Sequence, residues 1–371
     1  MSGKGMRKIH NMLKIALVNV LLIASIVGLV VLIPVASQVG YSIISRITPG
    51  SESATRAALP NYADTQWAHQ HFDDMRGLTT VYRDFVVWEA KPYESETINI
   101  GQDGLRHVVQ SSNVTRDEAW LFGGSTMWGY GSNDINTIPS ILSEITNLRV
   151  TNYSLVGYHA RQSVNKLISA YSDLTQSNDR NRIVIFYDGV NDVLDKCQAE
   201  NSGSGTAREQ QIRATVDLDD LSPLVAVRPA LALIERIDNA LDKSLMNSEY
   251  VCSEDPGRSE KIAQALVNDW VSADAIARVN GDRFIAILQP VAYLSNTRLE
   301  HLGADSKEWK KVARQYQAIY PAIRRSAGEA GIEFVDLTHI HDYDEFIYID
   351  FCHTSPNGNR TVAVAIAKLL T

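Results

Sequence analysis

The sequence predicts an α/β fold built on a doubly wound, parallel β-sheet. From residue 116 onward, short apolar segments alternate with longer segments in which apolar residues recur at helical spacing. The short segments are rich in β-branched residues, as is typical of strands that are buried on both faces. Such alternation indicates parallel pairing, because each helix returns the chain to the edge where the previous strand began. The expected strands are residues 119–122, 148–153, 183–187, 284–288 and 332–335.

The N-terminal segment has the composition of a membrane anchor. Residues 15–35 are almost wholly apolar and uncharged, and as a helix they would span about 30 Å, the thickness of a hydrocarbon core. Lysines and arginines precede this segment, and none follows before Arg46. The positive-inside rule therefore predicts that residues 1–14 are cytoplasmic and that the chain after a single transmembrane helix lies outside the cell membrane. The alternatives are a signal peptide cleaved near Ala36 and a buried soluble helix.

Residues 36–115 are expected to form a linker and an accessory segment. Residues 41–60 are polar and rich in small residues, as in a linker. Beyond them, residues 62–76 could form a short helix, residues 81–88 have strand composition, and residues 98–106 read as a strand edge and an Asp-Gly turn. We expect this segment to pack beside the main domain.

The main domain is expected to cover residues 116–371. Helices are predicted between its strands, and Ser355 with Pro356 forms an N-cap and N1 pair ahead of the last one. A long insertion at about residues 194–258 interrupts the domain, and because loops of this length are usually functional or disordered, we expect it to lie over the rim of the site. The helical patterns cover residues 137–145, 164–174, 229–245 within the insertion, 259–279, 307–330 and 361–370.

Three short segments carry the residues with catalytic chemistry. Ser125 stands in the run Phe-Gly-Gly-Ser-Thr-Met-Trp-Gly, between the first expected strand and a helix. Open α/β sheets place ligands at this edge, where strands end. Gly-Val-Asn-Asp follows the third strand and contains Asn191, and Asp-Phe-Cys-His near the C-terminus contains Asp350 and His353. Taken alone, each of these residues has a non-catalytic interpretation. Ser125 could be a helix cap, and His353 could be a core histidine.

Together these segments resemble the conserved blocks of the SGNH (GDSL-type) hydrolase family, in family order. The family's glycine block corresponds to residues 152–157, with Gly157 in the place of the glycine. Gly124 stands where an aspartate is usual, and Ser154 where a glycine is common. Residues 103–106, Asp-Gly-Leu-Arg, also resemble a run in membrane-anchored relatives, although a simple turn is the preferred interpretation. The resemblance implies a flavodoxin-like sheet of five strands.

The resemblance also implies a role for each residue. Ser125 would be the nucleophile, His353 the base that takes its proton, and Asp350 the group that orients the base. The oxyanion hole would consist of the backbone N–H groups of Ser125 and Gly157 and the side-chain amide of Asn191. Such a set transfers acyl groups from esters and needs no cofactor.

Composition excludes several other classes. The net charge of −8 argues against a nucleic-acid-binding protein. No Cys-x-x-Cys occurs, and the His-Ile-His-Asp run at residues 339–342 lacks a further ligand at suitable spacing, so no metal site is expected.

Cys197 and Cys252 bracket the insertion and are expected to form a disulfide that leaves Cys352 free, with three reduced thiols as the alternative.

These observations predict a membrane-anchored serine esterase in the periplasm or at the cell surface. It would remove O-acyl groups, acetyl first among them, from an acylated small molecule or an envelope carbohydrate. Two alternatives stay open: an O-acyltransferase with the same triad, and a non-catalytic surface protein that keeps the fold for binding.

Overall fold

The computed structural model describes residues 51–174, 181–199 and 249–370, together with residues 10, 14–15, 17–22, 25–26, 28, 201 and 209. The chain divides into two compact units, residues 1–50 with 213–247 and residues 51–212 with 248–371. In the first unit, the described residues are helical. Within the described part of the chain, no helix is both long and apolar enough to cross a membrane. Most of the expected span at 15–35, and all of the expected helix at 229–245, lie outside the described residues.

The second unit is built on a parallel sheet of five strands, as the sequence predicts. Counted along the chain, the spatial order of these strands is 2-1-3-4-5, the flavodoxin-like order. Trp120, on the first of these strands along the chain, pairs with Thr151 on one side and Val184 on the other. All five expected strands are confirmed, although the last begins at Phe334 instead of residue 332. In spatial order they are β6 (Arg149–Asn152), β5 (Glu118–Gly123), β7 (Arg182–Asp188), β8 (Arg283–Leu288) and β9 (Phe334–Asp336).

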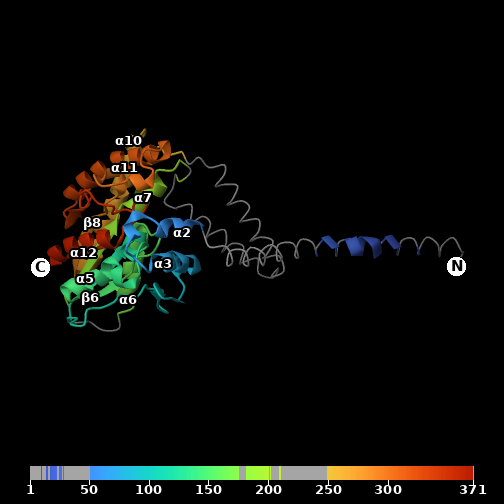
Figure 1. Ribbon diagram of the computed structural model, residues 1–371, viewed down its shortest axis with the longest axis horizontal. Helices are drawn as coiled ribbons and strands as arrows, with labels where there is room; N and C mark the ends of the chain where they lie inside the picture. Colours follow the sequence, from blue (N-terminus) through green and yellow to red (C-terminus); the bar gives the residue numbers. More distant parts are fainter. Residues whose placement is uncertain are drawn as a thin grey trace. The chain divides into compact units, whose positions relative to one another are not determined.

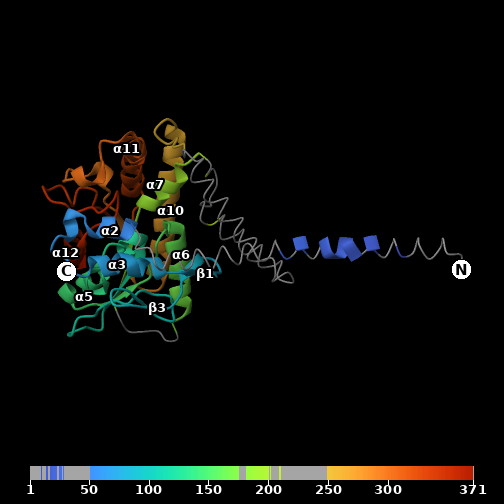
Figure 2. The ribbon, with the colours of Figure 1, turned by 45° about the vertical axis from the view of Figure 1, so that its right-hand side comes forward.

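Helices cover both faces of this sheet (Figure 1). Trp120 and Phe122 point to one face and Ala119 and Leu121 to the other, because side chains alternate along a strand. The first pair packs with α6 (Ala160–Ser172), α10 (Pro256–Val279) and α11 (Lys307–Glu329). The second pair packs with α5 (Ile138–Thr146) and α12 (Pro356–Leu370). Helices α6 and α10 run side by side (Figure 2).

Residues 51–115 belong to the same compact unit and differ from the expectation in two places. Residues 51–57, expected within a linker, form a helix that is held by a buried hydrogen bond from Ser53 Oγ to the carbonyl of Phe72. The expected strand at 81–88 is instead a hairpin, whose turn gives Phe85 a positive φ of 66°. The elements are α2 (Ser51–Ala57), η1 (Pro60–Tyr62), α3 (Ala68–Asp74), η2 (Met75–Gly77), β1 (Thr80–Arg83), β2 (Val87–Ala90), β3 (Tyr93–Glu94) and β4 (Asn99–Ile100).

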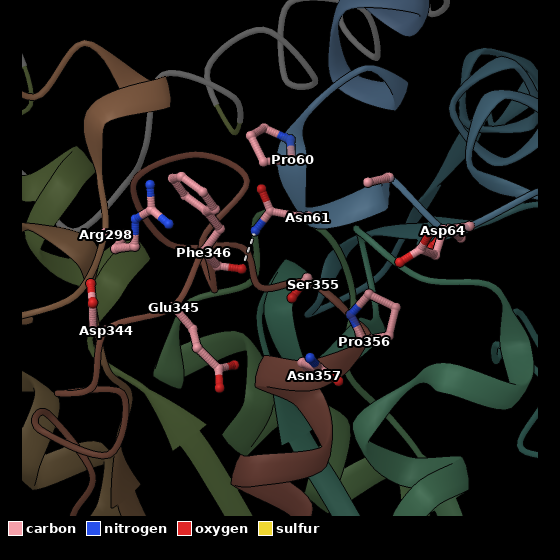
Figure 3. Close-up of a pocket in the computed structure, with 12 residues that line it drawn as sticks. Pro60, Asn61, Asp64, Arg298, Asp344, Glu345, Phe346, Ser355, Pro356 and Asn357 are labelled. Carbon is pink, nitrogen blue, oxygen red and sulfur yellow. Dashed lines mark hydrogen bonds between the residues drawn. The ribbon is translucent and has the colours of Figure 1, made fainter.

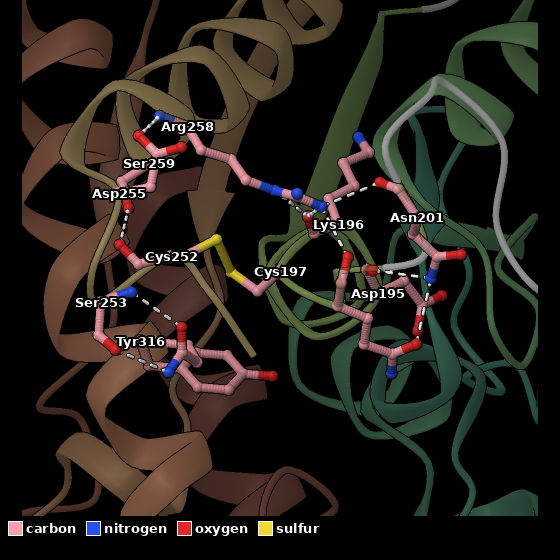
Figure 4. The surroundings of a disulfide bond; sticks show 12 residues. Asp195, Lys196, Cys197, Asn201, Cys252, Ser253, Asp255, Arg258, Ser259 and Tyr316 are labelled. Carbon is pink, nitrogen blue, oxygen red and sulfur yellow. Dashed lines mark hydrogen bonds between the residues drawn. A yellow bond between two sulfur atoms is a disulfide. The ribbon is translucent and has the colours of Figure 1, made fainter. Parts of the chain in front are cut away.

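A disulfide joins the two ends of the insertion. Cys197, at the end of α7 (Val190–Lys196), is bonded to Cys252, ahead of α10, and their Cα atoms are 5.2 Å apart. Arg258 strengthens this junction, since its guanidinium donates to the carbonyls of Lys196 at 2.7 Å and of Gln198 at 2.6 Å (Figure 4). Cys352 is buried and outside the disulfide.

We expect peptide mapping of the unreduced protein to recover Cys197 and Cys252 in one cross-linked pair. Replacing both by serine should lower the free energy of unfolding by up to about 4 kcal/mol, because the bridge closes a loop of 55 residues in the unfolded chain. Urea unfolding measures this loss, with Cys352→Ala as the control that keeps the bridge. A bridge that includes Cys352, or a double variant as stable as the wild type, would contradict the assignment.

Candidate active site

Ser125 is the first residue of α4 (Ser125–Trp128), which directly follows β5 and Gly124. The turn that places it there depends on Gly123, whose φ is 150°. A Cβ atom at this glycine would lie 2.4 Å from the carbonyl oxygen of Tyr187 on the neighbouring strand. The chain therefore passes from strand to helix close to the sheet, and Ser125 lies at its carboxyl edge, where open α/β sheets bind ligands.

Gly124 leaves room for the amide of Asn191. A Cβ atom at Gly124 would lie 2.4 Å from Asn191 Nδ2 and 3.3 Å from the carbonyl oxygen of Tyr158. The Asn191 amide donates to that carbonyl at 2.8 Å. A side chain at this position, such as the aspartate usual in the family that the sequence resembles, would require the Asn191 amide to move. This close packing also places the Asn191 side chain beside the residue that precedes Ser125.

Asp350 and His353 lie on a tight loop after the last strand. An antiparallel bridge between Tyr348 and Thr354 closes the loop at its base. Within it, the backbone N–H groups of Cys352 and His353 donate to Asp350 Oδ1 at 3.0 and 2.9 Å. These bonds turn the chain back on itself, so that residues three positions apart can meet through their side chains.

The structure brings Ser125, His353 and Asp350 together in one hydrogen-bonded line. His353 Nδ1 lies 2.6 Å from Asp350 Oδ2, and His353 Nε2 lies 2.6 Å from Ser125 Oγ. Burial acts to raise the pKa of Asp350, but His353 and the backbone N–H groups of the loop hold that pKa well below its usual value. A carboxylate accepts from Nδ1–H, which leaves Nε2 free to accept the hydroxyl proton of Ser125.

Gly157 lies in the loop between β6 and α6, with a φ of 83°. This loop runs beside the end of β5, since the N–H of Leu155 donates to the carbonyl of Gly123 at 3.2 Å. Trp88 fixes the loop from outside, because its indole N–H donates to Val156 and its carbonyl accepts from the hydroxyl of Tyr158 at 2.6 Å. The accessory segment therefore supports the loop that carries this glycine.

Two side chains beside the triad gave no signal in the sequence. The ring of Tyr130 stacks on the imidazole of His353, with centroids 4.2 Å apart and planes at 23°. Arg56 Nη1 donates to Asp350 Oδ2 at 3.2 Å. Both contacts join residues that are far apart in sequence, so only the folded chain reveals them.

The sequence interpretation assigned residues 103–106 to a simple turn, but the structure gives Arg106 a buried, structural role. Its side chain is fully buried and pairs with Asp134 at 2.8 Å. It also donates to the carbonyls of Gly129 at 2.7 Å and Ser132 at 2.6 Å, and it lies over the ring of Trp128. Arg106 thus holds the loop after α4, which carries Tyr130.

The polar residues around Asn191 have structural roles. Asp192 is buried and accepts from Lys196 at 2.7 Å and from the N–H of Ala160 at 3.3 Å. His159 is also buried, and its Nε2 lies 3.0 Å from Asp195 Oδ2. Burial disfavours the charged imidazole, but the neighbouring carboxylates raise the pKa of His159 overall. These contacts fix the start of α7, and with it the position of Asn191.

Asp350, Cys352 and His353 could hold a metal ion by distance alone, because their ligand atoms lie within 4.8 Å of one another. The chemistry of the set argues for another use. Burial raises the pKa of the Cys352 thiol well above its usual value, which disfavours the thiolate that metals bind. Both side-chain nitrogens of His353 already face Asp350 and Ser125.

A cavity of about 440 Å³ is lined in part by Pro60 and Asn61 of η1 and by Pro356 and Asn357 at the start of α12 (Figure 3). Ser355, two residues beyond the histidine, is part of its wall. Carboxylates, amides and a guanidinium dominate the lining, with one aromatic ring, Phe346. Such a surface suits a polar, hydroxyl-rich ligand better than a hydrocarbon chain.

No family model and no curated protein matches the sequence. Among solved structures, the chain is similar to a member of the lipolytic protein G-D-S-L family from Veillonella parvula, at 13% identity and a TM-score of 0.40, over 68% of this chain and 97% of that one. It is also similar to a carbohydrate acetylesterase from Sinorhizobium meliloti, at 11% identity and a TM-score of 0.37, over 68% and 98% of the two chains. An aryl esterase from M. smegmatis, in its inhibitor-bound form, has the same identity and coverage and a TM-score of 0.39. Because TM-scores below 0.5 carry no argument about function, we base the function on the geometry of the site.

Proposed function

We propose that this protein is a serine esterase that hydrolyses O-acyl esters. The observation that carries the proposal is the line of two 2.6 Å hydrogen bonds from Ser125 through His353 to Asp350. A nucleophile, a base and a group that orients the base are thereby in contact before any substrate binds. The three residues come from two distant parts of the chain, and each is held by backbone bonds of its own turn.

The reaction follows from this geometry. Ser125 Oγ attacks the carbonyl carbon of the ester while His353 Nε2 takes its proton, and Asp350 stabilises the imidazolium that forms. Collapse of the tetrahedral intermediate breaks the bond to the alcohol oxygen, which receives the proton from His353. Water then attacks the acyl-enzyme in the same way, with His353 again as the base, and releases the carboxylic acid and the free serine.

The oxyanion of each intermediate needs hydrogen-bond donors. We assign this role to the N–H groups of Ser125 and Gly157 and to the amide of Asn191. The Ser125 N–H is at the start of a helical turn, and the Asn191 amide has a second N–H beside the one that bonds Tyr158. Donors that are held in place before the reaction lose no energy to reorganisation when charge develops.

Asn191→Ala should lower kcat about 100- to 1000-fold with little change in KM, because the lost amide acts on the transition state. Steady-state kinetics on an aryl acetate measure this effect. Asn165→Ala is the matched control, since it removes an amide that donates to the carbonyl of Phe85 on the hairpin. A loss in kcat of less than about threefold for Asn191→Ala would remove this residue from the oxyanion hole.

For the substrate we propose O-acetyl groups on an envelope carbohydrate. The cavity that contains Ser355 has a polar lining, although no triad residue is part of it, and this lining supports a sugar, whose hydroxyls need hydrogen-bond partners. The net charge of −8 gives no attraction to nucleic acid or to anionic lipid. The disulfide supports a location outside the cytoplasm, where such bonds persist.

We further propose attachment to the cell membrane through residues 15–35, with the catalytic unit outside. Phosphatase fusions placed after Arg46 should be active in an exporting bacterium, because the lysines and arginines before the apolar segment retain that end in the cytoplasm. Activity of a cytoplasmic reporter at the same position would overturn this topology.

The proposed activity is tested with a serine-directed phosphonate probe. Specific labelling at Ser125 supports the nucleophile and excludes a protein that only binds. Acetate release from acetylated polysaccharide supports the substrate class, whereas a strong preference for long-chain esters would overturn it and leave the triad standing. Transfer of the acyl group to an added sugar, in place of water, would make the enzyme a transferase.

A further inference from the structure

Arg56 precedes the sheet in the sequence, and its positive charge lies beside Asp350. We propose that Arg56 is a positioning residue, which holds the carboxylate of Asp350 and extends the activity of His353 as a base to lower pH. The inference rests on the proposed function and adds a residue to it. It starts from the 3.2 Å contact between Arg56 Nη1 and Asp350 Oδ2.

With Arg56 in place, both oxygens of Asp350 have two donors each. Oδ1 accepts from the backbone N–H groups of Cys352 and His353, and Oδ2 accepts from His353 Nδ1 and Arg56. The Asp350 side chain is 22% exposed, so without Arg56 water would take the fourth position. The guanidinium thus limits rotation of the carboxylate, which in turn orients the imidazole.

The ring of Tyr130 contacts both Arg56 and the imidazole of His353. The guanidinium carbon of Arg56 lies 5.3 Å from the centroid of the Tyr130 ring, and that ring stacks on His353 at 4.2 Å. Arg56, Tyr130, His353 and Asp350 therefore form a closed ring of contacts. A side chain with two contacts in such a ring is better fixed than one in an exposed ion pair.

The helix that carries Arg56 is itself anchored on the catalytic loop. Ala57 and Leu59 pack against a buried cluster that contains Tyr62 and Phe72. Ile349, which directly precedes Asp350, belongs to the same cluster. The residues that place Arg56 and the residues that place Asp350 therefore share one small core.

The charge of Arg56 has a predictable sign of effect. Arg56 donates to the same Oδ2 that faces His353, so removing its positive charge in a variant should favour proton uptake at the site and move the loss of activity to higher pH. The other titratable groups that face the pair are Tyr62, Tyr130, Tyr293 and Cys352. Burial raises the pKa of Tyr62, Tyr293 and Cys352, which keeps these three neutral at working pH.

The test uses the full-length protein in detergent and compares the wild type with Arg56→Gln, Arg56→Lys and Arg325→Gln. Arg325 pairs with Glu260 on the surface of α11, so its replacement changes net charge equally without touching the site. The rate of phosphonate labelling at Ser125 and kcat/KM on an aryl acetate are each measured from about pH 5 to pH 9, across the range in which histidine titrates. Melting temperatures report any loss of stability.

Arg56→Gln should lower the plateau of both rates about tenfold and move their acidic limbs up by about half a pH unit or more. Arg56→Lys should keep the acidic limb near that of the wild type, since the charge remains, and Arg325→Gln should match the wild type. An unmoved acidic limb in Arg56→Gln, with or without a fall in melting temperature, would overturn the inference. If the wild type is not labelled at Ser125, the proposed function fails, and the inference fails with it.

Discussion

Ser125→Ala should abolish ester hydrolysis, with a loss in kcat of about a millionfold, and His353→Ala should have nearly the same effect. The reason is that the two side chains act as one unit. His353 Nε2 lies 2.6 Å from Ser125 Oγ, so removal of either partner leaves the ester without an activated nucleophile. The double variant should therefore lose no more than either single one, and the remaining rate should reflect the oxyanion donors and substrate binding alone.

Steady-state kinetics on an aryl acetate give these rates, and circular dichroism confirms that each variant is folded. Ser272→Ala and His69→Ala are matched controls, because both side chains are exposed and contact residues of their own helices, Asn268 and Asp73. Asp350→Asn should lower kcat as much as His353→Ala does, or less. Its amide oxygen can still accept from one ring nitrogen, but the uncharged amide does not stabilise an imidazolium. Turnover by Ser125→Ala above about one per cent of wild type would exclude Ser125 as the nucleophile.

The sheet and the contact between Ser125, His353 and Asp350 were predictable from sequence because each has a local signature. A strand that is buried on both faces has to be apolar along its whole length, as residues 183–187 are. Ser125 and Asn191 closely follow such strands, and the side chains of Asp350 and His353, three residues apart, can meet only through a tight loop. Local patterns of this kind survive without any knowledge of tertiary contacts.

The surroundings of the triad were not predictable, because they depend on contacts between distant segments. Residues 51–57 have linker composition, and their helix is stabilised by Ser53 and Ala57, which pack on α3 and its neighbours. Arg56 has no local feature that marks it as a partner of Asp350. The fit of Gly124 against Asn191 is likewise a property of two loops at the ends of different strands.

Arg106→Leu should lower the free energy of unfolding by about 3 to 5 kcal/mol, the range for breaking a buried ion pair from one side. Asp134 would keep one donor, the amide of Asn99 at 3.0 Å, but would lose its counterion. The carbonyl of Ser132 would lose the guanidinium as a donor, and the carbonyl of Gly129 would keep the N–H of Ser132 but lose Arg106. Burial lowers the pKa of Arg106, and the carboxylate of Asp134 opposes that shift. The charge of Arg106 therefore depends on its partner.

The same change should also lower kcat in the protein that remains folded, because Arg106 holds the loop that places Tyr130 against His353. Urea unfolding and kinetics below the transition separate the two effects. Arg360→Leu is the matched control, since Arg360 pairs with Glu144 in solvent and exposed pairs contribute little. Arg106→Lys keeps the charge but not the planar fork that reaches several acceptors, so its stability should fall between those of wild type and Arg106→Leu. A loss below about 1 kcal/mol in Arg106→Leu would mean that water replaces the guanidinium, and that the loop after α4 depends on packing around Trp128 instead.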